Sequence, residues 1–367
     1  MPTDDTATML LIENSILTQK EITNKKVIYD QTKGLNIIKS IIRNKKLMLH
    51  GGLAVNAVLP KSKKFYDETT VPDYDAMIPD NTGKITKKIM FEAQGKLTKA
   101  EYTAHFHPAI HGNTHKLRSH PKGITRLEAL RYPNIFDATS VPKKDFETLE
   151  TLAEKEKKLR PPELKSFTLV PTAWMKLSMH LEFSRPSVHI GRWSKLFPRC
   201  ARLYETFPTI LLTGKTSFKP GKHDKAAINK LLENNKEDTF VVGEYAALKI
   251  MGRDEGGRPA AVVKDLTKAH DLLYDAKLAP GEIVPESTFL PEHFRVGDST
   301  VYSWEECSAV VEDGLFGNSD TVLRYLYGEF IQYGTASVID DLVKFQLAQT
   351  ADDISKGIGT RFSTVCK

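Results

Sequence analysis

Two aspartates, Asp73 and Asp75, are the residues whose type and spacing most directly suggest chemistry, and an apolar run, residues 76–78, follows them. In a β-strand, residues i and i+2 point to the same face, so both carboxylates would project together. Two adjacent carboxylates repel each other unless a cation lies between them, and hard oxygen ligands suit Mg²⁺. The pair therefore predicts a magnesium site on one face of a strand.

A glycine pair, Gly51 and Gly52, lies upstream of the aspartates, between a short apolar strand (Leu47–Leu49) and an apolar helix that begins at Leu53. Without Cβ atoms, this backbone can approach a phosphate closely, and the helix that follows offers free N–H groups and the positive end of its dipole. Each feature alone also fits a tight turn or an acidic loop. A phosphate cradle beside metal-binding carboxylates predicts phosphoryl or nucleotidyl transfer.

A third acid, Asp137, interrupts the short apolar run Asn134–Thr139. A buried strand carries an acid at a cost unless the acid has a partner or a function. Asp137 is therefore a candidate for the same site, with a capping or loop aspartate as the alternative.

Basic residues are concentrated between Arg185 and Lys230, where ten Lys or Arg and two acids give +8, while the whole chain carries +6. A basic segment on a nearly neutral body suits a polyanionic partner, and a solvated basic face is the alternative.

The composition is that of an ordinary soluble protein of about two domains, with 367 residues, 40% hydrophobic and 27% charged. Its three cysteines are scattered and odd in number, which favours a reducing compartment over a zinc site or a disulfide framework. The first residues include Asp4 and Asp5 rather than a basic, apolar signal, and no stretch could span a bilayer. We expect no membrane partner and no secretion.

Hydrophobic periodicity and breakers give the order of elements. We expect helices over 32–44, 86–99, 145–160, 171–180 and 191–207, the last broken or kinked at Pro198, and strands over 104–119, 124–130 and 134–139. Gly214–Lys225 is the best boundary. The predicted domains are a variable lead-in (1–31), a catalytic domain (32–222) and a C-terminal domain (223–367).

An internal echo supports this division, because Thr239–Ile250 repeats the order of Leu47–Val58: strand, glycine, then an Ala-bearing helix. Gly243 aligns with Gly51, but Glu244 replaces the second glycine and no Asp-x-Asp follows within thirty residues. A second copy of the fold that has lost its chemistry would have this pattern.

A histidine-rich stretch raises the alternative of a zinc site, since imidazoles at i and i+2 share a strand face. No cysteine or acid closes such a site, so most of these residues are expected to be partly exposed strand positions. The stretch contains His105, His107, His111, His115 and His120.

Four blocks together resemble the catalytic core of viral poly(A) polymerases: Leu49–Asn56, Pro72–Asp75 with Pro79-Asp80 behind it, Ala109–Thr114 and Ile135–Pro142. The pattern is most similar to the enzymes of nucleocytoplasmic large DNA viruses of the mimivirus and asfarvirus type, with poxvirus enzymes as more distant relatives. Arg192, Trp193 and the basic residues after them resemble the Arg-Trp helix that follows the core in that family. The resemblance covers residues 35–207 well and the remainder faintly.

The resemblance implies an α+β fold, with a nucleotidyltransferase (polymerase-β-like) mixed sheet and flanking helices, followed by a second, degenerate nucleotidyltransferase-like domain. Asp73, Asp75 and Asp137 would be catalytic and hold two Mg²⁺ or Mn²⁺. Gly51, Gly52 and Lys195 would bind ATP. Arg192, Arg199 and Arg202 would bind RNA, and which basic residue contacts the triphosphate stays open.

The implied activity is template-independent addition of AMP from ATP to RNA 3′-ends, by a homodimer located in the host cytoplasm, the viral factory or the virion. The alternatives are another terminal nucleotidyltransferase, such as a CCA-adding enzyme, and a non-catalytic RNA-binding or processivity subunit. Three clustered acids argue against the last.

Overall fold

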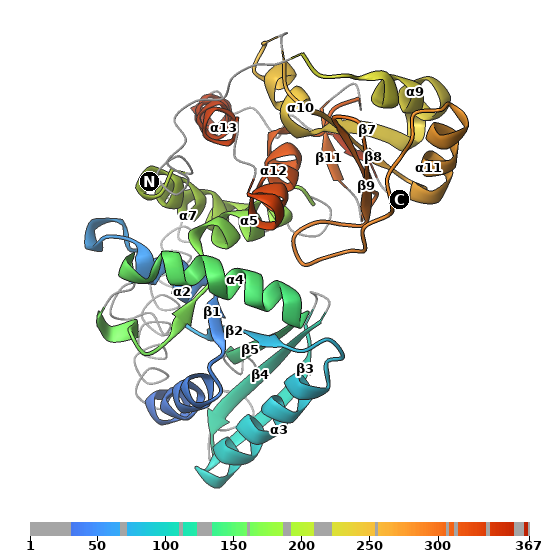
Figure 1. The fold of residues 1–367 in the computed structure, drawn as a ribbon. Helices are drawn as coiled ribbons and strands as arrows, with labels where there is room; N and C mark the ends of the chain where they lie inside the picture. The colour runs from blue at the N-terminus through green and yellow to red at the C-terminus, as the bar shows by residue number, and fades with distance from the viewer. Residues whose placement is uncertain are drawn as a thin grey trace, which may run out of the picture. The chain divides into compact units, whose positions relative to one another are not determined.

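The computed structural model describes residues 31–66, 72–109, 113–122, 134–159, 162–185, 192–208, 222–253, 256–305, 308–311, 315–334, 338–355 and 363–365 (Figure 1). The chain divides into two compact units between Val170 and Pro171. Each unit contains a mixed sheet with flanking helices, so the predicted α+β class is confirmed. The domain boundaries predicted at 31 and 222 stay predictions.

The first unit is built on a six-stranded sheet in the order β3-β4-β5-β2-β1-β6. β2 pairs antiparallel with β1 and parallel with β5, and β5 pairs antiparallel with β4. The strands are β1 (Met48–His50), β2 (Tyr74–Pro79), β3 (Tyr102–Pro108), β4 (Thr114–Pro121), β5 (Asn134–Val141) and β6 (Thr168–Leu169).

Helices cover this sheet with apolar faces at the spacing that the sequence suggests. The helix over residues 31–44 buries Ile38, Ile41 and Ile42, as expected. α3 (Lys84–Lys99) packs through Phe91 on Phe106 of β3, with ring centroids 4.8 Å apart. The other helical segments are α2 (Gly51–Val58), η1 (Lys61–Lys63), α4 (Lys143–Lys155), η3 (Lys157–Leu159) and η4 (Pro162–Leu164).

The strand expected over 104–119 is wrong in one respect, because β3 and β4 are two antiparallel strands of a hairpin. Both arms carry strand-like sequence, and Asn113, the residue directly before β4, has a φ of +61°. Asparagine tolerates this left-handed conformation better than most residues, which is a weak signal in a sequence. The strand expected over 124–130 lies outside the described residues.

The second unit has a four-stranded sheet in the order β7-β8-β10-β9 and a two-stranded sheet of β11 and β12. The strands are β7 (Thr239–Val242), β8 (Pro259–Val263), β9 (His293–Val296), β10 (Ser299–Ser303), β11 (Ser308–Val310) and β12 (Ser363–Val365). The helices are α5 (Thr172–Phe183), α7 (Trp193–Thr206), α9 (Ala226–Asn235), η6 (Lys236–Asp238), α10 (Gly243–Ile250), α11 (Leu266–Asp275), α12 (Ser319–Tyr333) and α13 (Ile339–Ser355).

The second sheet repeats the strand pairing of the first. β7 pairs antiparallel with β8, β8 parallel with β10, and β10 antiparallel with β9. β1, β2, β5 and β4 pair in the same way. Gly51 and Gly243 each open a helix of eight residues with a positive φ, +68° and +76°. Strand, glycine and helix therefore recur in the order that the internal echo suggested.

Of the two outcomes expected at Pro198, a break is wrong, because α7 continues through this residue to Thr206. Pro198 is on the exposed side of the helix, where water can solvate the carbonyl that its missing N–H leaves without a partner. Among the described residues, no helix has the length and apolar character needed to cross a membrane.

Candidate active site

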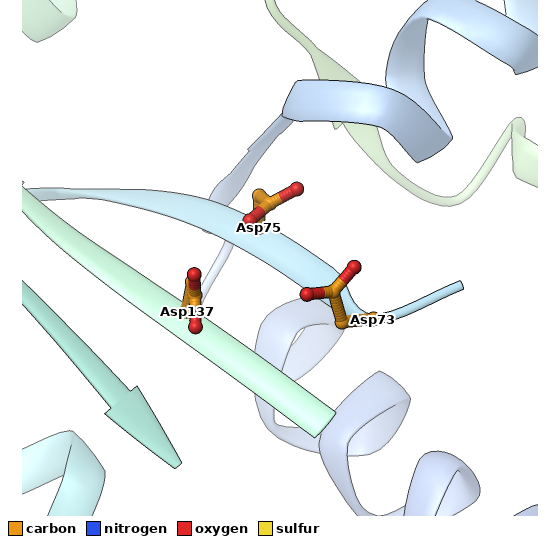
Figure 2. A group of neighbouring side chains, drawn as sticks. All are labelled: Asp73, Asp75 and Asp137. Carbon is orange, nitrogen blue, oxygen red and sulfur yellow. The ribbon is translucent and has the colours of Figure 1, made fainter. Parts of the chain in front are cut away.

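Three carboxylates converge at the centre of the first sheet (Figure 2). Asp75 on β2 and Asp137 on β5 are direct partners in the parallel ladder, and Asp73 comes immediately before β2. One oxygen from each carboxylate lies within 4.8 Å of the other two. The pairing of β2 with β5 thus brings together acids that are more than sixty positions apart in the sequence.

Asn134, which no sequence pattern marks as functional, holds two of these acids. Its amide nitrogen donates to Asp73 Oδ2 and to Asp137 Oδ1, both at 2.6 Å. The register between β4 and β5 shifts so that Arg118 pairs with Asn134 although Leu117 pairs with Phe136. This bulge explains how Asn134, three residues before Asp137, reaches the same face of the sheet.

The charge of Asp137 is balanced by the neighbouring strand. Lys116 on β4, its partner in the ladder, places Nζ 3.1 Å from Asp137 Oδ2. Asp137 is only 7% exposed, and burial raises its pKa, while Asn134 and Lys116 act in the opposite direction. Burial is the largest cause, so Asp137 holds a proton more readily than an ordinary aspartate.

The glycine turn lies directly against the second acid. A Cβ atom on Gly51 would be 2.0 Å from Asp75 Oδ2, and the φ of Gly51 is +68°. Only glycine satisfies both conditions. α2 has no acidic residue in its first turn, so its N-terminal end presents a positive dipole beside Asp75, and Gly52 occupies that first turn. A negatively charged ligand would be stabilised there.

The predicted cations lie in the second unit. Lys195, Arg199 and Arg202 are on α7; Lys195 is exposed and the two arginines are half-buried. Arg192 directly precedes α7, and its Nη1 lies 3.1 Å from Glu182 Oε2. Their roles in binding ATP and RNA stay predictions.

The histidines do not form a metal site within the described part of the chain. His105 and His107 share a face of β3, whereas His115 packs against Phe106, with ring centroids 6.2 Å apart, and so lies toward α3. His111 is outside the described residues. Among the groups searched, only the three aspartates come close enough to share an ion.

The three aspartates suit a hard divalent cation, because all their donor atoms are carboxylate oxygens. The amide of Asn134 already bridges Asp73 and Asp137 with one donor, at the position where a cation would neutralise both. The donor set therefore fits Mg²⁺ or Mn²⁺.

Comparisons with known proteins agree with this geometry. Residues 36–189 match the family model described as the poly(A) polymerase catalytic subunit. The matched range contains the glycine turn and all three aspartates, and it ends before α7. A comparison with curated protein sequences gives no match.

The fold is similar to the crystal structure of the Megavirus polyadenylate synthase, at 16% identity and a TM-score of 0.67. The alignment covers 98% of this chain and 77% of that one, so the likeness extends over both units. Residues 36–189 are therefore similar to the catalytic subunits of poly(A) polymerases, and the fold is similar to that of a viral polyadenylate synthase.

Proposed function

We propose that this chain adds AMP from ATP to RNA 3′-ends without a template, with two divalent ions held by Asp73, Asp75 and Asp137. The observation that carries the proposal is the convergence of these carboxylates beside the Gly51 turn. A metal site next to a helix N-terminus with no acid of its own is what a nucleoside triphosphate requires.

Each residue of the site has a proposed role that follows from its position. Asp73 and Asp75 would hold both ions, one on the triphosphate and one at the primer 3′-hydroxyl, and Asp137 would complete the second site. The backbone of Gly51 and Gly52 would bind the β- and γ-phosphates. The raised pKa of Asp137 also suits acceptance of the proton from the 3′-hydroxyl. The bound ions would supply charge neutralisation at the attacking and leaving oxygens.

The basic residues of α7, together with Arg192 directly before it, are proposed to bind the substrates. Lys195 is exposed and could neutralise the triphosphate or the RNA backbone. Arg192, Arg199 and Arg202 would bind RNA phosphates, which predicts affinity that falls steeply with salt and depends little on sequence.

The second unit is proposed to have a nucleotidyltransferase-like fold without catalytic activity. Val242, the residue before Gly243, pairs with Ala260 just as His50, the residue before Gly51, pairs with Asp75. When the strand pairing is followed across both sheets, each acid of the first unit has an equivalent position in the second. Asp73, Asp75 and Asp137 correspond to Arg258, Ala260 and Thr300.

An internal ion pair occupies the corresponding place in this unit. Glu244 is 4% exposed, and its Oε1 lies 2.7 Å from Arg258 Nη2. Glu329 Oε2 lies 3.6 Å from the same nitrogen. A buried acid at the glycine turn opposes a triphosphate by Coulomb repulsion, and the arginine takes the position of a metal ligand. We propose that this unit has a scaffolding role and forms the interface of a homodimer.

The test of this function is incubation of the purified protein with Mg²⁺, an oligo(A) primer and each NTP separately. We expect extension with ATP and none in EDTA. Extension that requires CTP and a tRNA end would identify a CCA-adding enzyme. RNA binding without extension under all four NTPs would identify a non-catalytic subunit.

Assembly and location follow from the resemblance and are tested separately. Sedimentation should give twice the mass of one chain. Labelling during infection should place the protein in the host cytoplasm, the viral factory or the virion.

A further inference from the structure

The row of side chains that contains Asp75 and Asp137 continues across the next two strands. Asp137 pairs with Lys116 on β4, and Lys116 pairs with His107 on β3. Directly opposed residues on neighbouring strands project to the same face of a sheet. The row of carboxylates is therefore followed by a lysine on β4 and a histidine on β3.

The adjacent row has the same character. Arg118 on β4 pairs with His105 on β3, and on its other side with Asn134, whose amide contacts the carboxylates. Residues i and i+2 of a strand share a face, so both rows lie together. We call Lys116, Arg118, His105 and His107 the cationic stripe, after the charges of its lysine and arginine.

This stripe is accessible and carries no acid. Arg118 and His105 are exposed, and Lys116 and His107 are partly exposed. Neither β3 nor β4 contains an Asp or Glu. The opposite face is apolar: Leu117 is fully buried, and Phe106 packs against α3. Lys116 and Arg118, the only Lys or Arg residues in β3 and β4, thus both lie on the active-site face.

The order of groups along the sheet indicates whether the stripe binds the triphosphate or the phosphates of the primer. The Gly51 turn flanks Asp75 on the β1 side, and the stripe flanks Asp137 on the β4 side. In-line displacement puts the leaving pyrophosphate and the attacking hydroxyl on opposite sides of the reacting phosphorus. If the triphosphate lies at the glycine turn, the attacking strand must arrive over β4 and β3.

We propose that the cationic stripe binds the phosphates of the last nucleotides of the RNA primer and so directs its 3′-hydroxyl to Asp137. This inference rests on the proposed function, because it takes the glycine turn as the triphosphate site. Contacts to phosphates carry no base information, so binding here is indifferent to primer sequence. Lys116, which is shared between Asp137 and the stripe, lies at the point where primer and site meet.

Arg118→Glu is the decisive variant, since Arg118 is exposed and forms no ion pair with a carboxylate in the described part of the chain. Lys88→Glu is the matched control, because Lys88 is exposed on α3 at the opposite side of the sheet and makes the same charge change. We measure KM for oligo(A), KM for ATP and kcat, together with oligo(A) affinity at several salt concentrations. Thermal unfolding checks the fold, and Arg118→Lys checks that charge is what matters.

Arg118→Glu should raise KM for oligo(A) by about tenfold or more while leaving KM for ATP unchanged. The slope of log affinity against log salt should fall by about 1. Lys88→Glu should match the parent protein, and Arg118→Lys should restore most of the affinity. A rise in KM for ATP alone, or identical oligo(A) affinity in all variants, would overturn the proposal. An inactive parent protein that still binds oligo(A) through Arg118 would instead refute the proposed function and leave this surface standing.

A crosslink locates the primer directly. An oligo(A) primer with a photoreactive 3′-terminal nucleotide should label the peptide that contains β4. Labelling confined to α7 would place the 3′-end on the second unit and contradict the assignment.

Discussion

A single amide, that of Asn134, stands between two of the acids that define the site. It donates hydrogen bonds to both Asp73 and Asp137. Without it, the negative charges of these neighbouring carboxylates would be less well compensated. We expect Asn134→Ala to destabilise the protein in EDTA by about 1–3 kcal/mol, and less in saturating Mg²⁺. Urea unfolding measures this. Asn44→Ala, which removes an exposed amide, is the control and should cost little. Equal losses with and without Mg²⁺ would show that Asn134 does not position metal ligands.

Asp137 gives the site a dependence on pH. Burial raises its pKa, so the folded state holds this proton more tightly than the unfolded state does. Its contribution to stability is therefore present below the unfolded pKa and is lost as pH rises through the folded pKa. Asp137→Asn should be more stable than the parent protein in EDTA near pH 8, with a smaller difference near pH 5. Thermal unfolding across this range tests it, and a difference that does not change with pH would contradict the burial of an ionising Asp137.

At this scale, sequence alone predicted the acids but not their partners. Asp137 was recognisable because one acid interrupts an apolar run. Asn134 and Lys116 had no such signal: the first reaches the site through a β-bulge, and the second through the register between β4 and β5. Neither a bulge nor a cross-strand register can be read from one chain segment, because both depend on the partner strand.

Among the elements, the turn between β1 and α2 has the least freedom to change. A methyl group on Gly51 would enter the carboxylate of Asp75, at a φ that disfavours any other residue. We expect Gly51→Ala to abolish primer extension, or reduce it at least a hundredfold, and to lower stability. Gly95→Ala is the control, since Gly95 lies in α3 with nothing within 4 Å of an added Cβ, and this change should stabilise by about 1 kcal/mol. Full activity in Gly51→Ala would mean that the turn does not shape the site.

The types of the elements were predicted correctly where the hydrophobic periodicity was strong. The predictions failed where the structure depends on local geometry. The helix over 31–44 and α3 follow from apolar spacing alone. The β3–β4 reversal and the continuation of α7 through Pro198 do not, because a short hairpin turn and a solvated missing hydrogen bond leave little trace in hydrophobic pattern.

For the molecule as a whole, the repeated sheet raises the question of whether the second unit binds nucleotide. Its glycine turn faces the pair formed by Glu244 and Arg258, whose side chains are 5% and 32% exposed. Arg258→Met would leave Glu244 buried without this partner, at a cost near the lower end of about 3–5 kcal/mol because Arg258 is partly solvated. Chemical unfolding should show this loss, and KM for ATP should not change. A large rise in KM for ATP, with the fold intact, would show that the second unit takes part in nucleotide binding.

Divalent ions held by Asp73, Asp75 and Asp137 beside a triphosphate at the Gly51 turn are the central claim of the proposed function. Anomalous diffraction at the manganese edge, from crystals grown with Mn²⁺ and a non-hydrolysable ATP analogue, tests that claim directly. We expect manganese coordinated by oxygens of all three aspartates, with the triphosphate against Gly51 and Gly52, and loss of that signal in Asp75→Asn crystals. A triphosphate bound elsewhere, or an aspartate cluster without manganese beside a fully bound analogue, would contradict it.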